Sequence, residues 1–107
     1  MEWRVEVLND TVRSELDVLP SEIRARLIRL ERLIAQVGLE TLREPYVKHL
    51  EGKLWEMRVT GRDGIARAIY VTAMGRRVVV VRAFIKKTQQ TPRSEIDLAL
   101  RRAKEIL

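Results

Sequence analysis

Three short runs of β-branched and aromatic residues stand in the middle of the chain, at residues 54–60, 65–72 and 77–85. Residues of these types favour strands over helices. The tetrapeptide Gly-Arg-Asp-Gly at 61–64 separates the first two runs, and the pair Met-Gly at 74–75 separates the last two. Short glycine-containing breaks between strand-like runs are typical of hairpins. The pattern therefore predicts a three-stranded antiparallel meander.

Before the meander, apolar residues first alternate and then recur at helical spacing. Residues 3–8 alternate as a half-buried strand does. Asn9 or Asp10 can cap a short helix that runs to about Leu19, and Pro20 fits the first turn of a second helix. Gly38 is suited to end this second helix. The second helix has a single apolar stripe of Ile23, Leu27, Leu30, Ile34 and Val37.

The segment after the second helix, residues 39–49, is predicted to be a connector, and a last helix follows the meander. Thr91 and Pro92 are typical of an N-cap followed by the first helical position. The apolar stripe of this helix is Ile96, Ala99, Leu100, Ala103 and Leu107.

These elements predict one α+β domain spanning residues 1–107. We expect an antiparallel twisted sheet, built from the N-terminal strand and the three-stranded meander, with two N-terminal helices and a C-terminal helix segregated from it. A chain of 107 residues can bury a core without disulfides or metal ions.

The predicted meander places arginines next to one another on one face. If the first hairpin closes symmetrically, Arg58 faces Arg67, and a two-residue turn in the second hairpin would place Arg82 opposite Arg67. Like charges directly opposite one another destabilise a sheet, whereas a phosphate lying across them would accept bidentate hydrogen bonds. The other face is predicted to be a core of Trp55, Met57, Val59, Ala68, Tyr70, Val79, Val81, Ala83 and Ile85.

Two alternatives to this row of arginines stay open. Glu56, on the same face, can neutralise the arginines or act as a base. The register can also differ by one residue, which would turn every side chain to the opposite face.

Further candidate RNA-binding residues follow the third run. Lys86 and Lys87 end it, and Gln89 stands just before the last helix, whose N-terminus is a favourable place for a phosphate. Phe84 can offer a ring on which a base stacks, although a single phenylalanine in a strand is more often part of the core.

Lys48, His49 and Lys53 precede the meander and can approach the same face. His49 is the only histidine, and its pKa range suits a general base, although a solitary histidine in a connector is more often merely exposed. The sequence has no glycine-rich phosphate loop, no cluster with metal-ligand spacing and no nucleophile beside a histidine. We therefore expect neither a cofactor nor a metal site.

The charge of the chain is uneven. Its formal net charge is +6, and residues 48–107 hold fourteen of the 21 basic side chains but only six of the 15 acidic ones. Such a bias is expected of a nucleic-acid binder, although a merely soluble basic surface would also show it. The absence of cysteine fits a reducing cytoplasm, and no apolar run is long enough to span a membrane.

Four stretches of the sequence resemble the phage-derived, HigB-like branch of the RelE/ParE toxin superfamily. They are LEGKLWEMRV from residue 50, IARAIYV from residue 65, VVVVRAFIKKTQQTP from residue 78, and EIDLALRRAKEI from residue 95. The matching residues are Leu50, Trp55, Glu56, Arg58, Arg67, Tyr70, Phe84, Lys86, Lys87 and Pro92.

The resemblance implies a RelE-like fold and the toxin of a type II toxin–antitoxin system. It implies an endoribonuclease that cleaves mRNA on the ribosome without a metal ion, by attack of the ribose 2′-OH on the scissile phosphate. It also implies a cognate antitoxin, commonly of the helix-turn-helix type, and a higher-order toxin–antitoxin complex.

Carried over by position, the resemblance implies functional roles for Arg58, Arg67, Lys86 and Lys87. The chain departs from the branch at Arg82, where a histidine is common, and it lacks a C-terminal tyrosine or histidine that some ribonuclease members use.

Two functions follow from the sequence. The first is an mRNA endonuclease in which Arg58, Arg67 and Arg82 grip the scissile phosphate and Lys86 and Lys87 bind flanking phosphates. The second is a non-catalytic binding protein, either a decayed toxin or a toxin that acts on a protein target such as gyrase.

Overall fold

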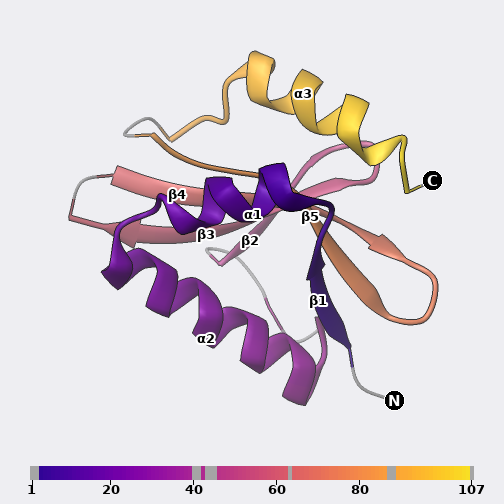
Figure 1. Ribbon diagram of the computed structural model, residues 1–107, viewed down its shortest axis with the longest axis horizontal. Coiled ribbons are helices and arrows are strands. Elements are labelled where there is room, and N and C mark those ends of the chain that lie inside the picture. The colour runs from indigo at the N-terminus through magenta and orange to yellow at the C-terminus, as the bar shows by residue number, and fades with distance from the viewer. Residues whose placement is uncertain (1–2, 40–41, 43–45, 63, 87–88, 107) are drawn as a thin grey trace.

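The computed structural model describes residues 3–39, 42, 46–62, 64–86 and 89–106. One five-stranded sheet lies between helices (Figure 1). The elements are β1 (Arg4–Val7), α1 (Asp10–Asp17), α2 (Ser21–Val37), β2 (Val47–Glu51), β3 (Leu54–Gly61), β4 (Gly64–Ala73), β5 (Arg77–Lys86) and α3 (Arg93–Ala103). The predicted α+β class is confirmed.

The strand order is β1-β5-β4-β3-β2, and the sheet is mixed. The meander of β3, β4 and β5 is antiparallel, as predicted, but β1 pairs with β5 in parallel. The predicted connector contains an additional edge strand, β2, which pairs with β3. The expectation of a wholly antiparallel sheet is therefore wrong at β1, and the sheet is one strand wider than predicted.

Helices cover both faces of the sheet. Helix α3 lies on one face and α2 on the opposite face (Figure 1). Two apolar cores result, because each face buries its own set of side chains. Val12, Ile23 and Ile34 of α1 and α2 pack on one face, and Ala99 and Ala103 of α3 pack on the other.

Two of the three local signals at the ends of the first two helices act as predicted, whereas Pro20, expected in the first turn of α2, is its N-cap. Asn9 is the N-cap of α1, and its side chain accepts a hydrogen bond from the Val12 amide. Pro20 precedes the first residue of α2, and Gly38 after its last residue has a positive φ of 93°. Thr91 was expected to cap α3, but Pro92 holds that position and no side chain caps the helix.

The first hairpin has the predicted register, with Gly61 opposite Gly64 and Arg58 opposite Arg67. The second hairpin differs. Ala73 pairs with Arg77, and a bulge between Ile69 and Tyr70 shifts the register again. The longer turn and the bulge each move the pairing of β4 with β5 by one residue from the predicted register. The total displacement beyond the bulge is two residues, so the side chains there keep their predicted face.

This displacement corrects two predictions about β5. Arg67 lies opposite Phe84, and Arg82 lies opposite Ile69, so the three arginines do not form one row. Val79 and Val81 pack in the α3 core rather than with Met57. Trp55 keeps its predicted face, since it pairs with Tyr70, but its side chain is 39% exposed.

Candidate functional site

Arg58 and Arg67, called the arginine pair from here on, lie on the face of the sheet that α3 covers in part. The backbone amide of Arg58 donates a hydrogen bond to the carbonyl of Tyr46, just before β2, and so points away from β4. Arg58 on β3 and Arg67 on β4 therefore form a non-hydrogen-bonded pair. Side chains in such pairs are closer together than in hydrogen-bonded pairs. The register therefore forces two guanidinium groups together.

Glu56 supplies the negative charge between the two arginines. Its Oε1 accepts a hydrogen bond of 2.6 Å from Arg58 Nε and lies 3.7 Å from Arg67 Nε. Glu56 and Arg67 are fully buried, whereas the side chain of Arg58 is 17% exposed. The predicted alternative of neutralisation by Glu56 is thus partly right, since one carboxylate faces two guanidinium groups.

The segment before α3 lies over the arginine pair. The backbone carbonyl of Gln89 accepts a hydrogen bond from Nη2 of Arg67 at 2.8 Å and another from Nη2 of Arg58. Thr91 Oγ1 donates to Oε2 of Glu56 at 2.6 Å. Two guanidinium groups therefore converge on a single oxygen atom, while the threonine orients the carboxylate that holds them.

Burial lowers the pKa of Arg67, and the positive charge of Arg58 lowers it further, while Glu56 opposes both effects. The guanidinium group of arginine stays protonated in proteins. The two arginines and Glu56 thus carry a net positive charge. Such a charge, reaching the surface at Arg58, favours an anionic ligand.

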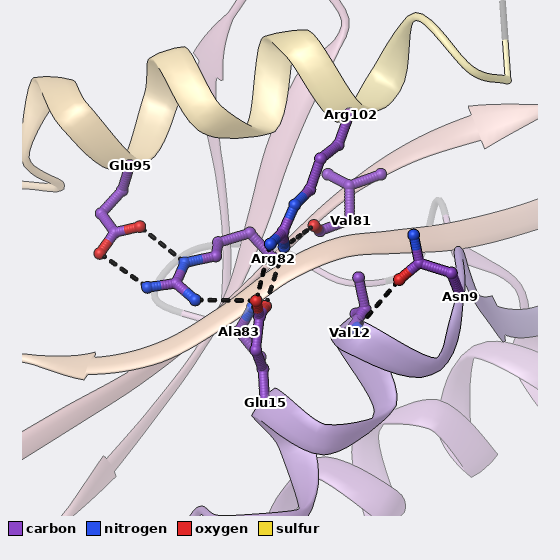
Figure 2. Close-up of polar contacts among 8 residues, drawn as sticks. All are labelled: Asn9, Val12, Glu15, Val81, Arg82, Ala83, Glu95 and Arg102. Carbon is purple, nitrogen blue, oxygen red and sulfur yellow. Dashed lines mark hydrogen bonds and ion pairs between the residues drawn. The ribbon is translucent and has the colours of Figure 1, made fainter.

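Arg82 belongs to a different cluster (Figure 2). Its Nε donates to Glu95 of α3 at 2.7 Å, and its Nη1 lies 3.0 Å from Glu15 of α1. Arg102 of α3 also pairs with Glu15, at 2.9 Å. We call these four residues the edge network. The two carboxylates balance the charges of the two arginines, so Arg82 is already engaged in ion pairs, and its role at a phosphate stays a prediction.

The edge network also satisfies backbone groups of β5 (Figure 2). The Ala83 amide donates to Glu15 Oε1 at 3.1 Å, and the Val81 carbonyl accepts from Arg102 at 2.8 Å. Strand β1 ends at Val7, which pairs with Val80, so no strand accompanies β5 at these residues. The side chains of Glu15 and Arg102 therefore supply the hydrogen-bond partners that a neighbouring strand would provide.

Phe84 is 7% exposed and packs in the α3 core, with the guanidinium carbon of Arg82 5.5 Å from its ring centre. Its ring is covered, and the expectation that it stacks on a base is wrong. Lys86 pairs with Ile65 two residues beyond Phe84, so it shares the face of the arginine pair, and it is exposed.

The residues before the meander are divided between the two faces. Lys48 is exposed and lies opposite Glu56, on the face of the arginine pair. His49 lies opposite Trp55 on the other face, where the two ring centres are 4.8 Å apart and His49 Nε2 is 2.7 Å from the Gly52 carbonyl. Lys53 is exposed in the β2–β3 turn. His49 is therefore not placed to act as a base beside Arg58.

The side chain of Gln89 is exposed. Lys87 lies outside the described residues. Within the described ranges, no group of three or more histidine, cysteine or acidic residues could hold a metal ion. No helix there is long and apolar enough to cross a membrane.

Sequence reasoning missed the contributions of Thr91 and of the Gln89 carbonyl. Thr91 was assigned to the helix cap because Ser or Thr before a proline fits that position well. A backbone carbonyl leaves no signal in the sequence at all. Its role follows only from the path of the chain after β5.

Comparisons with known proteins agree with this architecture. Residues 14–104 match the family model described as phage derived protein Gp49-like. The chain is similar to a chain in the crystal structure of the archaeal RelE-RelB complex from Pyrococcus horikoshii OT3, with a TM-score of 0.58 and 24% sequence identity. That match covers 79% of this chain and 96% of the other. The RelE-like fold is thereby confirmed. A comparison with curated proteins found no match.

Proposed function

This chain belongs to the phage-derived Gp49-like family, and we propose that it is the toxin of a type II toxin–antitoxin pair, an endoribonuclease that cleaves translated mRNA without a metal ion. Within the RelE/ParE superfamily we assign it to the HigB-like branch. Action on translated mRNA also implies a cytoplasmic protein.

The observation that carries this proposal is the convergence of Arg58 and Arg67 on one oxygen atom, the carbonyl oxygen of Gln89. A phosphate oxygen is a stronger acceptor than a carbonyl oxygen, because it carries negative charge. A scissile phosphate that displaced the carbonyl would meet two donors already directed at it. Donors that are fixed in advance are the main source of electrostatic catalysis.

In the proposed reaction the ribose 2′-oxygen attacks the adjacent phosphorus atom. A bond between the 2′-oxygen and phosphorus forms, and the bond between phosphorus and the 5′-oxygen breaks. The proton of the 2′-OH passes to water, and water returns a proton to the departing 5′-oxygen. The products are a 2′,3′-cyclic phosphate and a 5′-OH. Arg58 and Arg67 stabilise the negative charge that develops on the phosphate oxygens, and Glu56 holds Arg58 in place.

The exposed basic residues around the arginine pair would bind flanking phosphates. Lys48 and Lys86 share its face, and we assign the same role to Lys87, with Lys53 and Gln89 at the margin. We further propose a helix-turn-helix antitoxin as partner, together with a higher-order complex of the two proteins. The similar archaeal structure is of a complex of RelE with RelB, which supports a protein partner for this chain.

Inducible expression with mapping of mRNA 5′ ends tests the proposal. We expect new 5′ ends on translated messages and none when translation is blocked. Arg58→Ala should lower cleavage by roughly 100- to 1,000-fold, as expected for loss of one donor to a developing oxyanion. Arg58→Lys should recover little of the cleavage, because lysine lacks the planar guanidinium group with its paired N–H donors.

Arg77→Ala is the matched control. Arg77 pairs with Glu6 at the opposite edge of the sheet and is 37% exposed. This variant should cleave as the unmodified protein does. Intact messages during growth arrest, or full cleavage by Arg58→Ala, would contradict the proposed activity.

One observation favours the alternative, a non-catalytic binding protein. Arg58 and Arg67 already have acceptors within the chain, Glu56 and the Gln89 carbonyl. If these contacts persist in the presence of RNA, the arginine pair is structural. The same expression experiment separates the two functions, since a toxin that acts on a protein target arrests growth and leaves messages intact.

A further inference from the structure

Tyr46 is an exposed aromatic residue beside the arginine pair. Its carbonyl accepts the backbone amide hydrogen of Arg58 at 2.8 Å, which continues the register of the β2–β3 ladder one residue before Val47. Tyr46 therefore lies opposite Arg58, where neighbouring positions are about 5 Å apart. Its side chain is 54% exposed.

The alternation of side chains along β2 shows which face Tyr46 occupies. Val47 is 7% exposed and packs in the core formed with α1 and α2. Since successive side chains point to opposite faces, Tyr46 and Lys48 both lie on the face of Arg58. The exposed part of that face thus carries the Tyr46 ring opposite Arg58 and Lys48 two residues further along.

The burial of Phe84 makes this ring more significant. Phe84 lies on the other side of the arginine pair, opposite Arg67, but it is covered by α3. The other exposed aromatic side chain in residues 46–61, Trp55, lies on the opposite face and already contacts His49. Within this described segment, only Tyr46 combines an exposed ring with the face of the arginines.

We infer that Tyr46 is the residue on which a base of single-stranded RNA stacks when the adjoining phosphate binds Arg58. A base and its phosphate are joined through one ribose, so an aromatic ring beside a guanidinium group matches their separation. Rings of this kind hold bases by their faces and accept any base. Lys48, two residues further along β2, would contact the next phosphate.

The charge of this surface favours RNA over a protein segment as the occupant. Lys48, Arg58 and Lys86 share the face and are exposed or partly exposed, whereas Glu56 is fully buried and Glu51, at the end of β2, is paired with Arg93 of α3. An exposed ring between exposed cations suits a nucleotide, which presents an apolar face and an anion together.

This inference rests on the proposed function, but its test measures binding rather than cleavage. The probes are a single-stranded RNA hexamer and the same hexamer with one abasic position, bound to the full chain at fixed salt. Tyr46→Ala should weaken binding to the intact hexamer by roughly 5- to 150-fold, the range measured for loss of one stacked base. Tyr46→Phe should bind as the unmodified protein does.

Two further readouts distinguish stacking from other roles. The unmodified protein should prefer the intact hexamer over the abasic one, and Tyr46→Ala should lose this preference. Tyr46→Ala should keep the salt dependence of binding, whereas Lys48→Ala should reduce its slope by about one phosphate contact. Trp55→Ala, which removes a ring from the opposite face, should change neither the preference for the intact hexamer nor the salt dependence of binding.

Unchanged hexamer affinity in Tyr46→Ala overturns the inference, and so does an equal loss in Trp55→Ala. An effect of Tyr46→Ala on antitoxin binding alone overturns it too, and would make this ring a protein contact. Absence of RNA binding by the unmodified protein rejects it together with the RNA-gripping role. Stacking without any mRNA cleavage would support the inference and reject only the proposed nuclease activity.

Discussion

The arginine pair and the edge network are both built from arginines and glutamates, but their charges are balanced differently. In the edge network two carboxylates meet two guanidinium groups, and the contacts join α1, β5 and α3 (Figure 2). At the arginine pair, among the described residues, the Glu56 carboxylate contacts both guanidinium groups and the Gln89 carbonyl accepts hydrogen bonds from both.

This difference separates a structural use of arginine from a binding use. A network of equal and opposite charges has no excess charge to offer a ligand. A pair of arginines with one carboxylate keeps a positive charge, and a neutral carbonyl is an acceptor that an anion can replace. Proximity to the sheet face alone did not distinguish the two sites, because Arg58, Arg67 and Arg82 all lie on it.

The largest expected effect is the loss of Glu56. Glu56→Gln leaves the buried Arg67 without this carboxylate, and breaking a buried ion pair in this way costs about 3–5 kcal/mol of unfolding free energy. Urea unfolding measures the change. Glu51→Gln, at an exposed carboxylate on β2, is the control and should have little effect.

If Glu56→Gln fails to fold, the double variant Glu56→Gln with Arg67→Met keeps the test open. Removal of both charges should recover much of the lost stability, since neutral residues of similar size often replace a buried pair at little cost. A double variant that is less stable than Glu56→Gln would show that the two residues do not compensate each other.

Arg82→Ala should come next, with a loss of about 1–3 kcal/mol, because two partly buried glutamates then lose a hydrogen-bonding partner. Measurement of both unfolding free energy and mRNA cleavage on Arg82→Ala separates a structural role from a catalytic one. Cleavage by the folded fraction should be unchanged, in contrast to Arg58→Ala. A specific loss of cleavage at full stability would place Arg82 in the active site after all.

A third prediction concerns acid stability. Burial alone would raise the pKa of Glu15, but hydrogen bonds from Arg102 and Ala83 and the charge of Arg82 outweigh it, and its pKa is lowered. A carboxyl whose folded pKa lies below its unfolded value stabilises the protein above the unfolded pKa, about 4.5. That stability is lost as the pH falls through the folded pKa.

Glu15→Gln should therefore reduce the difference in unfolding free energy between pH 6 and pH 3, roughly the range over which such a carboxyl titrates. Urea unfolding at a series of pH values measures it, with Asp17→Asn, an exposed change on the same helix, as control. An unchanged pH profile would mean that other carboxylates cause the acid sensitivity.

The smallest effect is expected at Arg93. It pairs with Glu51 and Asp97, and the hydrogen bonds that it donates to both carboxylates raise the pKa of Arg93, yet its side chain is 60% exposed. Ion pairs in contact with water contribute little to stability. Arg93→Ala should leave the urea midpoint unchanged within error, and a large shift would show that this surface pair orients α3.

The sequence predicted the first hairpin correctly because its two glycines define a short turn, and the turn determines the register of Arg58 and Arg67. The second hairpin was harder for a physical reason. Val78, Val79, Val80 and Val81 are all buried, since both faces of β5 are covered. No register exposes a valine, so the alternation that normally reveals a bulge is absent.

Other features depend on contacts between distant residues. The parallel pairing of β1 with β5 and the presence of Glu15 and Glu95 beside Arg82 follow from topology, not from local sequence. The resemblance identified Arg58 and Arg67, and the register brought them together. The resemblance could not reveal that both arginines donate hydrogen bonds to the Gln89 carbonyl, because every residue has a backbone carbonyl.

The way the edge network closes β5 has a consequence for self-association. An uncovered strand edge offers amides and carbonyls to any second molecule, and natural proteins block such edges with charged side chains. Glu15 and Arg102 block this one at Ala83 and Val81. A chain that loses these two side chains would become prone to pair edge to edge with its own copies, so they protect solubility at this strand as well as stability.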